Sequence, residues 1–87
     1  MTEKDVKVKG DAGVHARPAM MLVKEAMKYP CEVYLIKEGT KANGKSIMSV
    51  LALAITPGST LTISADGEGE EEVVNTLVEM IESDFSA

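Results

Sequence analysis

Cysteine, histidine and aromatic residues are scarce in this chain. Its 87 residues include one cysteine, one histidine, two tyrosines and one phenylalanine, and there is no tryptophan. The lone Cys31 excludes an internal disulfide, and Cys31 and His15 together cannot supply the four ligands of a tetrahedral zinc site. We therefore expect neither a bound metal nor a cofactor.

Long apolar runs are missing as well. The first ten residues contain no apolar signal-peptide core, and no apolar stretch reaches the roughly 20 residues that a transmembrane helix needs. These absences predict a cytoplasmic protein that does not insert into a membrane.

Acidic residues outnumber basic ones by 14 to 9, which gives a formal net charge of -5. Nucleic acids and anionic membranes repel such a chain, so neither is expected as the main partner. Basic protein surfaces are better candidates. The length predicts one small domain, residues 1–87, with a modest core, and we expect a monomer.

Hydrophobic periodicity predicts seven elements in the order βαββαβα. Strands are expected at 6–8, 32–36, 40–42 and 61–64, and helices at 16–28, 47–54 and 70–83. Glu38-Gly39 is typical of a hairpin turn, and the acidic run at 70–72 suits a helix N-terminus. Strands on one side and helices on the other make a two-layer α+β fold.

The two longer helices should each bury an apolar stripe. In the first helix, the residues expected to pack on the sheet are Ala19, Leu22, Val23, Ala26 and Met27. In the last helix they are Val73, Leu77, Met80 and Ile81.

The segment Gly13-Val14-His15-Ala16-Arg17-Pro18-Ala19 places the histidine where a helix starts. Proline suits the first helical turn, so the pattern predicts His15 as the N-cap. A helix N-terminus binds anions, Arg17 adds a cation, and the same positive field disfavours a protonated ring. A neutral imidazole can attack phosphorus, which makes His15 a candidate phosphoryl acceptor. An ordinary helix cap is the alternative interpretation.

Histidine chemistry suits a carrier of phosphoryl groups. A phosphoramidate gives up its phosphoryl group readily, whereas a phosphoserine ester would retain it. At an N-cap, Nδ1 is the ring nitrogen able to face that group. The expected hydrogen-bond donors are the backbone N–H groups of Ala16 and Arg17, because Pro18 has none, and the Arg17 guanidinium can pair with phosphate oxygens.

Ser46 precedes the predicted helix at 47–54 and has the residue type of an N-cap. Such a serine is normally structural, and the pattern alone leaves open whether Ser46 also has a regulatory role.

Six of the 87 residues are methionine. Core packing is the default interpretation of methionines at helical spacing. Those on the His15 side of the first two helices also suit a flexible apolar docking surface for several partners. The candidate docking residues are Met20, Met21, Lys24, Lys45, Ile47, Met48 and Leu51.

Segments 13–19, 43–50 and 59–67 read GVHARPA, NGKSIMSV and STLTISADG. Together they resemble the HPr family, the histidine-containing phosphocarriers of the bacterial sugar phosphotransferase system. The resemblance covers almost the whole chain, and its most specific parts are 15–18 and 45–48. It implies an open-faced β-sandwich, with a four-stranded antiparallel sheet covered on one face by three helices.

The resemblance also implies a function. His15 would take a phosphoryl group on Nδ1 from phosphoenolpyruvate-charged enzyme I and pass it to the IIA components of sugar permeases, so the protein would carry a group rather than act as an enzyme. Ser46 would be phosphorylated by an HPr kinase/phosphorylase, with a catabolite-control transcription regulator as a further partner. The contact face would lie on the first two helices.

Two alternatives stay open, a carrier of a nitrogen-related phosphotransfer chain and a mainly regulatory HPr-like protein. Ser46 within K-S-I-M favours the sugar branch, and His15 favours a carrier. Ala12 and the pair Met20-Met21 depart from the family pattern. Ala12 cannot orient the histidine as a Ser or Asn there can, and the methionine pair leaves partner preference open.

Overall fold

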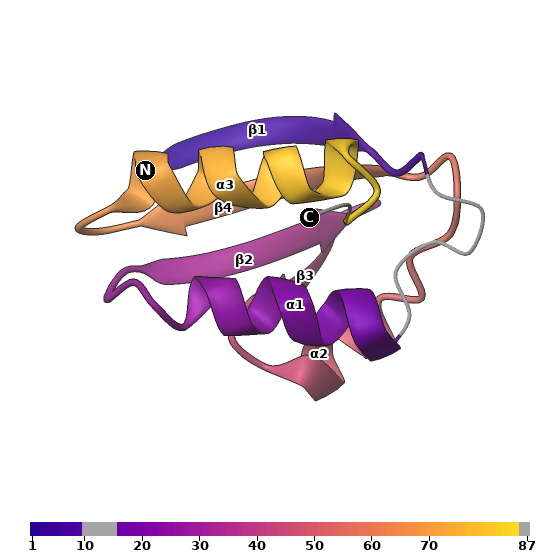
Figure 1. The fold of residues 1–87 in the computed structure, drawn as a ribbon, viewed down its shortest axis with the longest axis horizontal. Coiled ribbons are helices and arrows are strands. Elements are labelled where there is room, and N and C mark those ends of the chain that lie inside the picture. Colours follow the sequence, from indigo (N-terminus) through magenta and orange to yellow (C-terminus); the bar gives the residue numbers. More distant parts are fainter. Residues whose placement is uncertain (10–15, 86–87) are drawn as a thin grey trace.

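The strands pair into one antiparallel sheet. The computed structural model describes residues 1–9 and 16–85. In chain order its elements are β1 (Thr2–Lys7), α1 (Ala16–Ala26), β2 (Glu32–Lys37), β3 (Thr40–Asn43), α2 (Ile47–Ala52), β4 (Thr60–Asp66) and α3 (Glu70–Glu82). The strand order is β1-β4-β2-β3, and each neighbouring pair is antiparallel. The predicted βαββαβα order is confirmed (Figure 1).

Alternate strand residues form the sheet's half of the core. The central strand β4 buries Leu61, Ile63 and Ala65 completely, and its register places Ile63 opposite Leu35 of β2. Successive side chains of a strand point to opposite faces, so these residues share one face. Helix α3 packs against β1 and β4 over that face, while α1 lies beside α2 (Figure 1).

The other face of the sheet carries polar side chains that contact one another. The Thr62 hydroxyl donates to the Asp5 carboxylate at 2.6 Å, and the Tyr34 hydroxyl donates to Glu32 at 2.6 Å. The Lys41 ammonium lies 4.0 Å from the centre of the Tyr34 ring. These contacts make the sheet two-sided, with a dry face toward the helices and a polar face opposite.

Most of the predicted helical stripes are confirmed. Helix α1 buries Ala19, Leu22, Val23 and Ala26, and α3 buries Val73, Leu77 and Ile81, while Met80 is partly buried. The prediction for Met27 is wrong, because its side chain is exposed. Helix α1 ends at Ala26, and Tyr29 rather than Met27 packs against the core beyond that end.

Several predicted boundaries differ from the structure. Helix α1 ends two residues before position 28, and α2 ends at Ala52 rather than 54, since Ala54 adopts a left-handed φ of 51°. Strands β1 and β4 extend beyond the segments in which apolar and polar residues alternate. Their backbone pairing runs from Thr2 opposite Ala65 to Lys7 opposite Thr60. Polar residues outside the alternating apolar pattern thus belong to the strands because they pair with the neighbouring strand.

The predicted hairpin turn at Glu38-Gly39 is confirmed. Both residues have positive φ, 49° for Glu38 and 82° for Gly39. This is the signature of a type I′ turn, whose twist matches that of paired strands. The turn joins β2 directly to β3.

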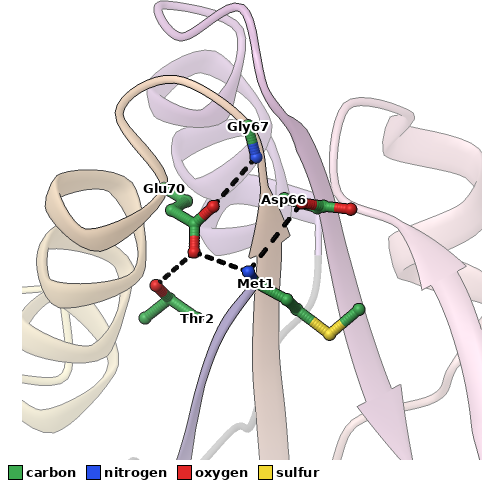
Figure 2. Close-up of polar contacts among 5 residues, drawn as sticks. All are labelled: Met1, Thr2, Asp66, Gly67 and Glu70. Carbon is green, nitrogen blue, oxygen red and sulfur yellow. Dashed lines mark hydrogen bonds and ion pairs between the residues drawn. The ribbon is translucent and has the colours of Figure 1, made fainter.

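A polar cluster ties the first residues of the chain to the start of α3 (Figure 2). The Glu70 carboxylate accepts hydrogen bonds from the Thr2 hydroxyl at 2.6 Å and from the Gly67 N–H at 3.0 Å. It also pairs with the Met1 amine at 3.0 Å, and that amine lies 3.9 Å from Asp66. One carboxylate therefore fastens β1 to the connection between β4 and α3.

These contacts favour the ionised form of Glu70. The Thr2 and Gly67 hydrogen bonds, together with the Met1 amine, lower the pKa of Glu70 from 4.5 to about 2. A carboxyl whose pKa is lower in the folded state stabilises the fold above its unfolded pKa. That contribution is lost as the pH falls from about 4.5 toward 2.

We predict that Glu70→Gln flattens the acid limb of the stability profile. The amide keeps the side-chain size but does not titrate, so the free energy of unfolding should change less between pH 5 and 2 than in the unmodified protein. Urea unfolding at a series of pH values measures this, with Glu71→Gln, at an exposed neighbouring position, as the control. Parallel profiles for Glu70→Gln and the unmodified protein would contradict the assignment.

Candidate functional site

The start of α1 lies at the surface of the molecule. Helix α1 begins at Ala16; Ala16 and Arg17 are exposed, and Pro18 is buried. Residues of the first turn have no carbonyl acceptor within the helix for their N–H groups. Since Pro18 has no N–H, Ala16 and Arg17 supply the donors of this turn. His15, the predicted N-cap and phosphoryl acceptor, lies outside the described residues.

Charge in the first turn distinguishes α1 from α3. Residues 16–19 include no acidic residue, and Arg17 adds a positive charge. The first turn of α3 instead carries Glu70, Glu71 and Glu72. In both helices the dipole places a positive partial charge at the N-terminus, but of the two only α3 offsets that charge with its own carboxylates. The start of α1 is thus the better place for a bound anion.

An apolar groove of about 550 Å³ runs along α1 from this point. We call it the α1 groove; its lining residues are Ala16, Arg17, Met20, Met21, Val23, Lys24, Met27 and Ile47. Ile47 is the first residue of α2, so the α1 groove reaches the neighbouring helix. Ala16 and Arg17, which are predicted to hold phosphate, therefore share this groove with four of the predicted docking residues.

The predicted docking residues do not all line this groove. Met20, Met21, Lys24 and Ile47 do, while Met48 and Leu51 are exposed on α2. Sequence reasoning missed Met27, which the structure places in the α1 groove rather than in the core. Its position near the end of the helix could have indicated this, since an apolar residue beyond the last turn of a helix need not face the core.

Lys45, another predicted docking residue, makes contacts within the molecule. Its ammonium donates to the Tyr29 carbonyl at 2.6 Å, just beyond the end of α1, and its N–H donates to the Asn43 side chain at 2.9 Å. A cation near the C-terminal end of a helix interacts favourably with the dipole there. Lys45 thus ties the start of α2 to the end of α1.

Ser46 is the N-cap of α2, as predicted. It has extended backbone angles, φ -125° and ψ 116°, and its hydroxyl oxygen accepts a hydrogen bond from the Ser49 N–H at 3.3 Å. The side chain therefore satisfies one of the donors that the helix start leaves without a partner. Ser46 is partly exposed, beside the exposed Ile47 and Met48.

The opposite end of α2 is held by Lys37. This residue ends β2, and its ammonium donates to the Ala54 carbonyl at 2.8 Å and to the Leu53 carbonyl at 3.3 Å. Both carbonyls follow the helix directly. With Ser46 at one end and Lys37 at the other, the short α2 is fixed by side chains at both ends.

Neither a metal-binding cluster nor a membrane-spanning helix is present among the described residues. Across residues 1–9 and 16–85 no cluster of three or more His, Cys, Asp or Glu side chains could hold a metal ion. Within those same ranges no helix has the length and apolar character to cross a membrane.

Comparison with known proteins agrees with this geometry. A family model described as PTS HPr component phosphorylation site matches residues 2–83. The HPr-like protein Crh of Halalkalibacterium halodurans is 43% identical over 97% of this chain and its own full length. The phosphocarrier protein HPr of Haemophilus influenzae is also 43% identical, over 93% of this chain and 95% of its own.

Solved structures show the same fold. HPr-C-His from Thermoanaerobacter tengcongensis superposes with a TM-score of 0.93 at 39% identity and covers 98% of this chain and 96% of its own. An HPr dimer from the same organism has a TM-score of 0.78 at 38% identity, with full coverage of both chains. At least one such relative therefore forms dimers.

We predict that Ser46→Ala lowers the free energy of unfolding by about 1 kcal/mol, because the Ser49 N–H loses its acceptor. Urea unfolding measures the change. Ser49→Ala is the matched control, since it removes a hydroxyl from the same helix but leaves the Ser49 N–H in place. Equal effects of the two substitutions would show that the cap contributes nothing.

Proposed function

Because the chain belongs to the HPr family of phosphocarrier proteins, we propose that His15 accepts a phosphoryl group from phospho-enzyme I and passes it to the IIA components of sugar permeases. The observation that carries this proposal is the exposed start of α1, directly after His15, where Ala16 and Arg17 offer N–H donors and a fixed cation without acidic neighbours in the turn.

The proposed transfer needs few groups. The lone pair of Nδ1 attacks phosphorus, an N–P bond forms, and the bond between phosphorus and the donor protein breaks, while the other ring nitrogen keeps its proton. The N–H groups of Ala16 and Arg17 and the Arg17 guanidinium stabilise the charge on the phosphoryl oxygens. The same groups remain when an acceptor on IIA attacks phosphorus and the N–P bond breaks.

The α1 groove supports docking of more than one partner. A carrier must meet its donor and its acceptors with the same surface, because both approach the same imidazole. Met20 and Met21 suit this need, since an unbranched thioether side chain adapts its shape to different surfaces. Lys24 at the same groove would meet acidic groups on either partner.

A mainly regulatory HPr-like protein is the second candidate. The chain is equally similar to one protein named Crh and one named HPr, so overall identity does not separate the two functions. His15-Ala16-Arg17-Pro18 supports a carrier, because a purely regulatory protein has no need of a nucleophilic imidazole beside an anion site. Ser46 within K-S-I-M supports the sugar branch over a nitrogen-related phosphotransfer chain.

Regulation at Ser46 completes the proposal. An HPr kinase/phosphorylase would phosphorylate Ser46, and a catabolite-control transcription regulator would recognise the product. The phosphate adds about -1.5 to -2 charges beside Ile47 and Met48, where a donor's acidic groups would approach Lys24. We place the carrier in the cytoplasm and expect a monomer. The alternative is a dimer like that of the relative from Thermoanaerobacter tengcongensis.

Incubation with phosphoenolpyruvate and enzyme I tests the carrier function. The unmodified protein should gain the mass of one phosphoryl group in an acid-labile form, because an N–P bond hydrolyses in acid. His15→Ala should gain none, while Ser46→Ala should still be labelled. Absence of any gain in the unmodified protein would favour the regulatory alternative.

A negative charge at position 46 should slow the labelling of His15. We expect Ser46→Asp to lower kcat/KM for phosphorylation by enzyme I on the order of tenfold, through like-charge repulsion at the docking face. Ser46→Asn is the matched control, since asparagine caps a helix equally well without charge. Equal rates for Asp and Asn at this position would rule out an electrostatic effect.

A further inference from the structure

Exposed methionines gather on one surface of the molecule. The side chains of Met20, Met27 and Met48 are 55%, 66% and 78% exposed. Met20 and Met27 line the α1 groove, and Met48 follows Ile47, which lines it too. These three exposed methionines, half of the six in the chain, thus lie in or next to a single groove, where they contribute little to the core.

The remaining methionines differ in position or exposure. Met21 also lines the α1 groove but is only partly exposed, and Met80 is partly buried against the core on α3. Met1 is exposed, but its amine pairs with Glu70 at the start of α3. The chain therefore contains natural comparisons for both the location and the exposure of a thioether.

We propose that Met20, Met27 and Met48 form an oxidation site, at which peroxides convert the thioethers to sulfoxides and thereby lower phosphoryl transfer through His15. The inference rests on the proposed carrier function. It follows from the chemistry of an exposed thioether, which is oxidised reversibly to a polar sulfoxide that methionine sulfoxide reductases return to methionine.

The oxidation step balances with peroxide as the oxidant. A sulfur lone pair attacks one peroxide oxygen, an S–O bond forms and the O–O bond breaks. For hydrogen peroxide, the departing oxygen leaves as hydroxide and, with a proton transferred from the oxygen bound to sulfur, becomes water. The sulfur is oxidised by two electrons, and the peroxide is reduced by the same two.

Oxidation should weaken docking more than folding. The three side chains are exposed, so adding an oxygen to each sulfur disturbs little core packing. A partner that covers the α1 groove would have to desolvate the sulfoxide oxygens without offering them donors, which is unfavourable. We expect about a tenfold fall in kcat/KM for transfer from phospho-enzyme I.

The test follows oxidation and transfer on the same samples. After treatment with hydrogen peroxide, peptide mass spectrometry gives the oxidation rate of each methionine, and phosphorylation by enzyme I gives kcat/KM. Met20, Met27 and Met48 should oxidise faster than Met21 and Met80. Transfer should fall as they oxidise, and treatment with MsrA and MsrB should restore it.

The control variant replaces all three methionines by leucine. Its rate after peroxide is compared with its own rate before, so that any change in its basal docking cancels. This variant keeps Met1, Met21, Met80 and the buried Cys31, and should retain its rate after peroxide. Met80→Leu keeps the three groove methionines and should lose activity as the unmodified protein does.

Two results would overturn the proposal. One is an equal loss of rate in the triple leucine variant, and the other is oxidation of Met20, Met27 and Met48 no faster than that of Met80. If the untreated protein takes no phosphoryl group from enzyme I, the carrier function fails instead, and the oxidation rates still decide whether the site exists.

Discussion

The rotation of α1 about its own axis is the constraint on which the candidate site depends. Ala19, Leu22, Val23 and Ala26 are at most 4% exposed, and together they define the face that packs inside. One residue corresponds to about 100° around a helix, so turning α1 by a single position would bring Lys24 into the core in place of Val23. Burial thus directs Met20 and Lys24 outward along the α1 groove.

Helix α2 is positioned in a different way. Six residues form less than two turns, which is too short to be stable alone. It persists because Ser46 caps its start, Lys37 holds the carbonyls after its end, and Lys45 fastens it to the end of α1. Only Val50 of α2 is buried in the core. The surface shared by α1 and α2 therefore joins a helix fixed by a whole buried face with one fixed by a single buried residue and by polar contacts at its ends. A modification at Ser46 would therefore act on α2, where the N-cap is one of only a few contacts that hold the helix in place.

Sequence patterns predicted the order of the elements because the causes of each element are local, whereas the four-stranded antiparallel sheet was implied by the resemblance to the HPr family. Hydrophobic alternation located β1 and β4, helical spacing located α1 and α3, and the Glu38-Gly39 pair located the hairpin. The N-cap at Ser46 is equally local, since a serine oxygen reaches an N–H three residues ahead.

Interactions between distant residues were not predictable in the same way. The Thr2 and Glu70 contact joins positions 68 apart, and the extended ends of β1 and β4 exist only because the two strands pair. Met27 was misassigned because periodicity indicates a helical face but not where the helix stops. The hydrogen bond from Lys45 to the Tyr29 carbonyl was likewise not predicted, because it depends on how two helices meet.

The distribution of charge reconciles an acidic chain with an anion site. A net charge of -5 spread evenly would oppose a phosphoryl group anywhere on the surface. Instead, three carboxylates offset the dipole of α3, while α1 begins with Arg17 and no acidic residue. The proposed phosphoryl group would meet two backbone donors and one guanidinium at an exposed helix start rather than in an enclosed pocket. That limited set matches the needs of a carrier, because a site that bound the group more tightly would hinder its release to the next protein.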